Sequence, residues 1–140
     1  MYKRQGAKRA SSIAEVVAAS NIVFLSLPGG PQVEQVIAGP GGVLENCRSG
    51  QIIVDSSTAP VGLTRSLAAK LAEKGVAFAD TPVARTRQAA EAGTLSIMVG
   101  ADPDVYERLE PFLAMAATDV THCGPIGCGQ VVKILNNMVL

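Results

Sequence analysis

The sequence lacks an excess of charge of either sign. Twelve basic and twelve acidic residues in a chain of 140 give a formal net charge of zero. Without a broad electrostatic field, the chain has little to attract nucleic acid or an anionic membrane. We therefore expect its partner to be a small molecule.

Long apolar runs and paired cysteines are missing too. No stretch of about 18 apolar residues occurs, and residues 1–12 (MYKRQGAKRASS) are basic without the apolar core of a signal peptide. The cysteines, Cys47, Cys123 and Cys128, are odd in number and lack the paired spacing of a zinc site. These features predict a cytoplasmic protein with free thiols and no bound metal.

A third missing feature is the phosphate-binding turn of a complete dinucleotide-binding domain. Apolar β-branched runs alternate with helical patterns, which is typical of βα units and a mostly parallel sheet. Such a domain usually begins with a strand and a G-x-G-x-x-G turn, but nothing before Asn21 supplies them. We predict an α/β fold, a partial Rossmann-type doubly wound sheet that lacks its first strands.

Local patterns place the expected elements along the chain. Helices are expected at 11–20, 31–39, 60–75, 102–116 and 129–140, and strands at 21–28, 51–58, 76–83, 95–101 and 119–124. Ser11 or Ser12 with Glu15 is typical of a capping box at the start of the first helix. Arg85 and Arg87 follow the third strand and are expected in a loop.

The carboxyl ends of the strands are where an open α/β sheet gathers its functional groups. Arg85 and Arg87 are either solvated there, or one of them grips a carboxylate, sulfonate or phosphate. His122 stands beside Cys123 but has no second histidine or paired acid in its segment, which favours a structural role. The ends concerned read SLPGG, DSST, DTPVART, VGAD and HCGPIG.

The last segment, GPIGCGQVVKILNNMVL, combines a glycine-rich turn with an apolar helix. Its glycines follow the order G-x-x-G-x-G, so it is not the dinucleotide fingerprint. Either the turn is merely flexible, or it lets the backbone approach a ligand while the helix N-terminus faces an anion. Lys133 and Asn137 share one helix face, where apolar neighbours favour the neutral amine of a general base and an amide can bind substrate. Asn136 projects toward a different side, facing either a cofactor or solvent.

Taken in order, four motifs resemble those of the β-hydroxyacid dehydrogenases, the family of 3-hydroxyisobutyrate dehydrogenase, with 6-phosphogluconate dehydrogenase more distant. They are FLSLPGG, IIVDSST, FADTPVxxxxxxAEAGTLSIMVGA and GPIGCGQVVKILNN, and the resemblance runs from about Gly6 to Leu140. It implies oxidation of a β-hydroxyacid with NAD or NADP by a Rossmann domain joined through a long helix to an all-helical C-terminal domain. Residues 6–128 would be a truncated NAD(P)-binding domain and 129–140 the start of the interdomain helix. Residues 1–5 do not fit the family and are expected to be a non-native leader.

The resemblance also implies site residues. Lys133 matches the catalytic lysine, which takes the substrate's hydroxyl proton as hydride leaves for the nicotinamide. Asn137 matches the asparagine that orients the substrate, with Asn136 beside it in the motif. The implied cofactor contacts are Leu27 and Pro28, Thr58, and Gln32, which stands where some members place an asparagine near the nicotinamide.

The substrate loop departs from the family's usual PVSGG. This chain has Val83, Ala84, Arg85 and Thr86 instead, which puts 3-hydroxyisobutyrate itself in doubt. The arginine–threonine pair is closer to the sulfolactaldehyde reductase branch, whose PVGRT loop holds a sulfonate with its arginine. This similarity predicts that Arg85 binds the anionic tail of the substrate and that Thr86 assists.

The resemblance leaves two alternatives open. The chain can be a noncatalytic α/β module that binds an anion or nucleotide, or an inert fragment whose sheet edge and final apolar helix associate with other chains. As a fragment of a dehydrogenase, the chain itself is expected to be inactive and to bind NAD weakly or not at all. Intact homologues are expected to be homo-oligomers.

Overall fold

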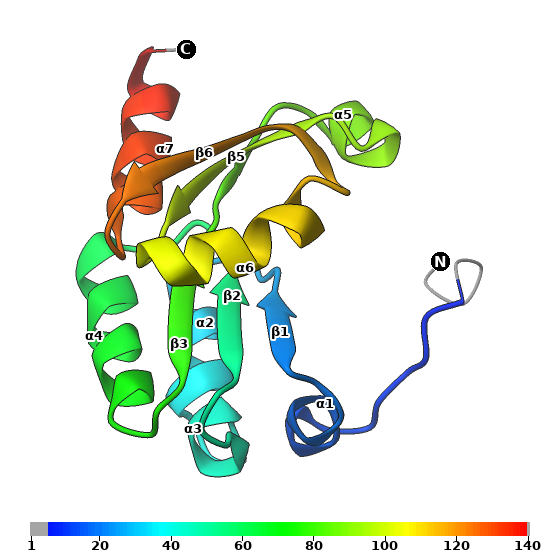
Figure 1. Ribbon diagram of the computed structural model, residues 1–140, viewed down its shortest axis with the longest axis vertical. Helices are drawn as coiled ribbons and strands as arrows, with labels where there is room; N and C mark the ends of the chain where they lie inside the picture. The colour runs from blue at the N-terminus through cyan, green and yellow to red at the C-terminus, as the bar shows by residue number, and fades with distance from the viewer. Residues whose placement is uncertain (1–5, 140) are drawn as a thin grey trace.

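Six strands form one mixed sheet in the computed structural model, which describes residues 6–139 (Figure 1). The predicted leader, residues 1–5, lies outside the described residues. The strands are β1 (Ile22–Leu25), β2 (Ile52–Asp55), β3 (Ala77–Asp80), β4 (Val83–Ala84), β5 (Leu95–Gly100) and β6 (Ala117–Gly124). The helices are α1 (Ile13–Ala19), α2 (Gly30–Ala38), α3 (Val43–Asn46), α4 (Val61–Ala72), α5 (Arg87–Ala92), α6 (Pro103–Leu113) and α7 (Cys128–Val139).

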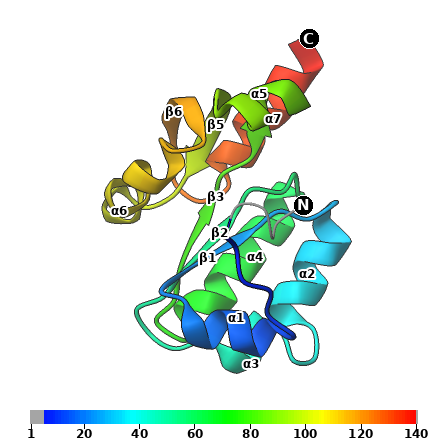
Figure 2. The same cartoon turned by 90° about the vertical axis from the view of Figure 1, so that its right-hand side faces the viewer.

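The sheet has two parts, β1 to β3 and β4 to β6, which are joined through β3 and β5 and are offset along the strand direction. Strands β1, β2 and β3 are parallel, whereas β5 runs antiparallel to β3 and β4 and parallel to β6. Asp80, at the end of β3, pairs with Gly100, while Val83 pairs with Ile97 farther along β5. The region of β5 and β6 therefore projects past the carboxyl ends of β1 and β2 (Figure 2). The predicted α/β class and mostly parallel sheet are confirmed.

Two apolar clusters, one on each face of the sheet, form the core. The first lies between helices α1 to α4 and one face of β1, β2 and β3, with Phe78 and Leu67 fully buried at its centre. The second lies under α6 and includes Ile52, Val99 and Leu109. Strands β2 and β3 are covered on both faces and have the continuous apolar sequence of buried parallel strands, whereas Phe24 leaves one face of β1 partly exposed.

Local capping explains where several helices begin. Ser12 caps α1 by accepting the N–H of Glu15, and the Glu15 carboxylate accepts from the backbone and hydroxyl of Ser11, the residue before the cap, in a variant of the predicted capping box. Thr86 likewise caps α5 by accepting the N–H of Ala89. The expectation that Arg87 lies in a loop is wrong, because this cap and the helix-favouring run RQAAEA start a short helix there.

The described residues offer no preformed metal site. Within residues 6–139, no group of three or more His, Cys, Asp and Glu side chains could hold a metal ion. Cys47, Cys123 and Cys128 are free thiols. No helix in that range is both long and apolar enough to cross a membrane.

Candidate functional site

Helix α7, which packs against β5 and β6, carries the predicted catalytic lysine. Lys133 and Asn136 are half-buried, whereas Asn137 is exposed. Among residues 6–139, Lys133 forms no ion pair, so its amine is available to a ligand. The apolar neighbours expected to desolvate it are themselves exposed: Val131, Val132, Ile134, Leu135, Met138 and Val139.

The first turn of α7 is held by a buried carboxylate. Asp80 Oδ1 accepts the N–H of Gly127 at 2.6 Å, and Oδ2 accepts that of Gln130 at 2.8 Å. Burial raises the pKa of Asp80, the two N–H groups lower it, and the neighbouring Asp55 adds a smaller rise. Of the two alternatives left open for this turn, the one in which the helix N-terminus faces a ligand anion does not hold for these two N–H groups, because Asp80 is their acceptor.

Gln130 links α7 to the loop that follows β2. Its Nε2 donates to the carbonyl oxygen of Ser57 at 2.8 Å, and its Oε1 accepts the N–H of Ala59 at 3.2 Å. The Ser57 hydroxyl accepts the N–H of Leu27 at 2.9 Å, which joins the loop after β1 to the same network. The structure thus brings the loops of two predicted cofactor contacts, Leu27 and Thr58, together with the helix of Lys133.

The predicted cofactor contacts lie in the segments that follow the carboxyl ends of β1 and β2. Leu27 is half-buried, and Pro28, Gln32 and Thr58 are exposed. Helix α2 begins directly after this turn, and its N-cap Gly29 supplies no side-chain hydrogen bond. A helix N-terminus without a side-chain cap, beside an apolar leucine and proline, fits a ligand such as NAD that has both polar and flat apolar parts.

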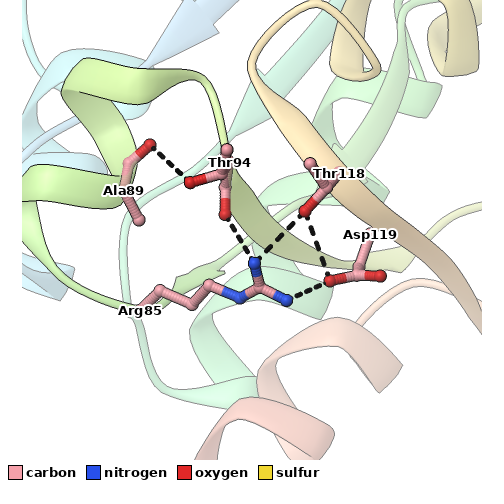
Figure 3. A network of polar contacts seen from close by, with 5 residues as sticks. All are labelled: Arg85, Ala89, Thr94, Thr118 and Asp119. Atoms are coloured by element: carbon pink, nitrogen blue, oxygen red, sulfur yellow. Dashed lines mark hydrogen bonds and ion pairs between the residues drawn. The ribbon is translucent and has the colours of Figure 1, made fainter.

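Arg85 lies in a polar network at the amino end of β5 (Figure 3). Its Nη1 donates to the carbonyl oxygen of Thr94 at 2.9 Å and to the hydroxyl of Thr118 at 3.2 Å. Its Nη2 forms an ion pair with Asp119. The predicted anion-binding guanidinium therefore already has an acidic partner, though both side chains remain about half exposed.

The backbone at Arg85 adopts a conformation that favours glycine. Its φ is +84°, and among the described residues no other non-glycine residue has a positive φ. Position 85 is also where the PVSGG motif of the resembled family has a glycine. The strained arginine is held by its side-chain contacts, and such strain is typical of functional loops.

A cavity of about 450 Å³ lies between this loop and the ends of β1 and β2. Arg85, Thr86 and Arg87 line it together with the hydroxyl-bearing Ser26 and Ser56, and none of the carboxylate side chains in residues 6–139 lines it. The structure thus brings the predicted anion-binding pair Arg85 and Thr86 to the strand ends. It does not bring them against Lys133, since α5 and α7 lie toward opposite ends of β5 (Figure 1).

Three residues that hold the candidate site together, Asp80, Gln130 and Asp119, were not predicted from the sequence. Asp80 ends a buried strand, and Gln130 stands in an apolar run directly after Gly129, so each was a polar residue where an apolar one is the norm. That signal could have identified both. Asp119, by contrast, is an exposed acid on β6 with nothing in the sequence to relate it to Arg85.

Comparison with known proteins identifies the family. The NAD binding domain of 6-phosphogluconate dehydrogenase matches residues 1–124. The chain belongs to this family. The match confirms the sequence resemblance and, at the level of the family, the predicted cofactor NAD or NADP.

Relatives of this NAD-binding domain include named hydroxyacid dehydrogenases. The 2-(hydroxymethyl)glutarate dehydrogenase of Eubacterium barkeri is 46% identical over 136 residues, which are 97% of this chain and 45% of that protein. The structure titled Mycobacterium tuberculosis 3-hydroxyisobutyrate dehydrogenase with L-serine is 35% identical, with a TM-score of 0.87 over 93% of this chain and 44% of the other. Psf3 in complex with NADP+ and 2-OPP is 32% identical, with a TM-score of 0.93 over 98% and 49%. The chain therefore spans less than half the length of these relatives.

The conformation of Arg85 predicts how this NAD-binding domain responds to substitution. Arg85→Ala and Arg85→Gly both remove an exposed ion pair, which contributes about 0 to 1 kcal/mol. Only glycine also relieves the positive φ, so Arg85→Gly is expected to unfold with a free energy about 1 kcal/mol higher than Arg85→Ala. Urea denaturation followed by circular dichroism measures the difference, and equal stability of the two variants would contradict the strain.

Asp55 predicts a pH dependence of stability in the same domain. It is fully buried; its Oδ1 accepts the N–H of Ser57, and within the described residues its Oδ2 has no hydrogen-bond partner. Burial raises the pKa of this carboxyl, although its hydrogen bonds with Ser57 lower it. The folded chain therefore binds the proton more tightly than the unfolded chain, and this contribution is complete below the unfolded pKa, about 4. It is lost as the pH rises through the folded pKa.

The free energy of unfolding should thus contain a term that decreases as the pH rises from about 4, and Asp55→Asn should remove that term. Chemical denaturation across this pH range gives the slope. Asp104→Asn, at an exposed position, is the control and should leave the slope unchanged. Superimposable profiles for Asp55→Asn and the wild type would show that Asp55 is not responsible.

Proposed function

We propose that this chain is the cofactor-side domain of an NAD(P)-dependent dehydrogenase that acts on a small 3-hydroxyacid or a related anionic alcohol or aldehyde. One observation carries the proposal: Gln130 joins the loop of Thr58 to the helix of Lys133. A cofactor-contacting loop and a general base must be held together for hydride transfer. The names of the hydroxyacid dehydrogenases similar to this chain support the same reading.

In the proposed reaction, the cofactor accepts the hydride, and residues of this chain accept the proton and orient the substrate. Bound NAD or NADP supplies the hydride acceptor. As the general base, Lys133 accepts the hydroxyl proton at Nζ while the adjacent C–H bond loses its electron pair as hydride and the C–O bond becomes a carbonyl. Asn137, one turn later on the same face, orients the substrate through its amide, with Asn136 beside it.

The cofactor contacts of the proposal lie at the ends of β1 and β2. Leu27 and Pro28 offer an apolar surface, and Thr58 a hydroxyl, on loops that are tied to each other through Ser57. Gln32 is exposed in the first turn of α2 and can reach a polar group of the cofactor. The exposure of Pro28, Thr58 and Gln32 leaves these groups free to make such contacts.

Arg85 is the proposed grip on the substrate's anionic group, with Thr86 assisting. Its present partner, Asp119, is half exposed, so a substrate carboxylate or sulfonate can replace it on the guanidinium. The cavity that Arg85 lines reaches Ser56, the neighbour of the Ser57 that Gln130 holds. An anion bound at Arg85 would thus extend toward the strand ends where the cofactor loops lie. Because α5 and α7 lie toward opposite ends of β5, the proposal requires the substrate to span from Arg85 to Lys133 (Figure 1).

A chimera tests this assignment. Residues 6–140 replace the matching segment of the Eubacterium barkeri dehydrogenase, because the chain covers less than half of that protein. In the chimera, Arg85→Ala is expected to raise KM for 2-(hydroxymethyl)glutarate or a hydroxysulfonate about tenfold or more, since a charge-assisted grip contributes about 1.5 to 3 kcal/mol. Arg87→Ala is the control: Arg87 lines the same cavity but is more exposed and pairs with Glu91. An unchanged KM for Arg85→Ala would refute the role of Arg85.

The proposal also includes expectations about the partner, the location, the oligomeric state and the activity of the chain alone. The partner is a small anionic substrate, this protein is cytoplasmic, and its intact homologues form homo-oligomers. The 140-residue chain alone is expected to show little activity and weak affinity for NAD, which calorimetric titration would measure.

A further inference from the structure

Gln130 is fully buried and uses its backbone N–H and both ends of its side chain. Its N–H donates to Asp80, its Nε2 donates to Ser57, and its Oε1 accepts from Ala59. One side chain therefore bonds to the backbone on both sides of Thr58. A buried amide with both ends satisfied is rigid, because losing either bond leaves an unpaired polar group in the interior.

The start of α7 has almost no room to shift against the sheet. A Cβ atom placed on Gly129 would lie 2.5 Å from the carbonyl oxygen of Met98 and 2.8 Å from Asp80 Oδ2. A Cβ on Gly100 would lie 2.4 Å from Asp80 Oδ1. The helix therefore touches β3 and β5 directly through its backbone, and the bonds of Gln130 transmit that fixed position to the loop after β2.

Lys133 lies three residues after Gln130, almost one helical turn, and so projects from the same side of α7. Hydride transfer is sensitive to such geometry, since misplacing reacting groups by about 1 Å can cost about a hundredfold in rate. A shift of α7 relative to the Thr58 loop would move the proposed base relative to the cofactor.

We propose that Gln130 is a positioning residue that couples the loop carrying Thr58 to the helix carrying Lys133 and Asn137. The inference rests on the proposed function for its catalytic meaning, but the coupling itself is a property of this chain. Gln130 touches neither substrate nor cofactor in the proposal, and it acts through the two elements that it joins.

The test is a pH titration of the 15N-labelled 140-residue chain carrying Gln130→Glu. When protonated, the introduced carboxyl can donate to Ser57 and accept from Ala59, as the glutamine does. When ionised, it faces the Ser57 carbonyl oxygen without a proton to donate, so the link opens on that side. We expect the backbone amide signal of Thr58 and the side-chain amide signal of Asn137, about 10 Å farther along α7, to shift with one common midpoint.

Val131→Glu is the matched control. It places a titrating carboxyl on the next residue of α7, which is exposed, and thereby isolates the effect of charge alone. Asp55 and Asp80 titrate in every variant, so in the control the Thr58 signal should shift no more than it does in the wild type. If in Gln130→Glu the Thr58 signal titrates while that of Asn137 does not move beyond its shift in the control, the coupling is overturned.

Gln130→Met provides a second test should the glutamate variant fail to fold. Methionine fills a similar volume without either hydrogen bond. Amide hydrogen exchange at Ala59 and Lys133 is then expected to accelerate at least tenfold at both sites. An unchanged exchange rate at Lys133 would overturn the proposal. Neither test requires turnover, so a coupled chain whose chimera lacks NAD-dependent activity would refute the proposed function alone.

Discussion

Replacing Lys133 with methionine in the chimera is expected to lower kcat by a factor of about 10² to 10⁴, the range that general acid–base catalysis supplies. The residue lies on a helix whose first turn is fixed by Asp80 and Gln130, so its position is set by the fold. Methionine keeps the length and apolar stem but cannot exchange a proton. Steady-state rates of NADH formation measure the effect.

Two variants separate lost proton transfer from a general disturbance. Lys133→Arg keeps a positive charge but cannot deprotonate near neutral pH, so its kcat should stay close to that of the methionine variant. Lys74→Met changes an exposed lysine after α4 and should leave kcat within about twofold. A Lys133→Met enzyme that retains more than a third of the wild-type kcat would remove Lys133 from the mechanism.

Asp80→Ala is expected to cost the largest amount of stability, about 3 to 5 kcal/mol in the free energy of unfolding of the 140-residue chain. Asp80 is fully buried and accepts two backbone N–H groups, and hydrogen bonds to a charged group contribute about 1.5 to 3 kcal/mol each. Alanine leaves both donors at the start of α7 without an acceptor. Urea denaturation monitored by circular dichroism measures the loss.

Asparagine at the same position distinguishes the hydrogen bonds from the volume. Asp80→Asn keeps one acceptor oxygen but turns an NH₂ group toward the second N–H, so its stability should fall between those of wild type and Asp80→Ala. Asp104→Ala, an exposed change in the first turn of α6, should cost less than about 1 kcal/mol. A cost below about 1 kcal/mol for Asp80→Ala would show that the carboxylate does not hold α7.

Features that depend on neighbouring residues could be predicted from the sequence. The run QIIVDSST gave the buried strand β2, and the spacing of Lys133 and Asn137 placed them on one face of α7. The capping box at Ser12 was visible for the same reason, since its partner lies three residues away. The short helix α5 was missed, although its N-cap Thr86 and alanine-rich sequence are also local signals.

The frame of the candidate site depends on residues far apart in the chain. Asp80 meets Gly127 and Gln130 across 47 and 50 residues, and Gln130 meets Ala59 across 71. Periodicity and spacing carry no information about such pairs. The positive φ of Arg85 could not be predicted either, because a positive φ is expected at glycine and not at arginine.

The most direct test of the proposed function is NADH formation by the unmodified chimera with 2-(hydroxymethyl)glutarate, measured beside the parent Eubacterium barkeri dehydrogenase. If this chain supplies a working cofactor frame and general base, the chimera should turn over at a rate within about tenfold of the parent, and Lys133→Met should abolish most of that rate. A chimera that folds with native-like stability but forms no NADH with any hydroxyacid or hydroxysulfonate would contradict the proposed function.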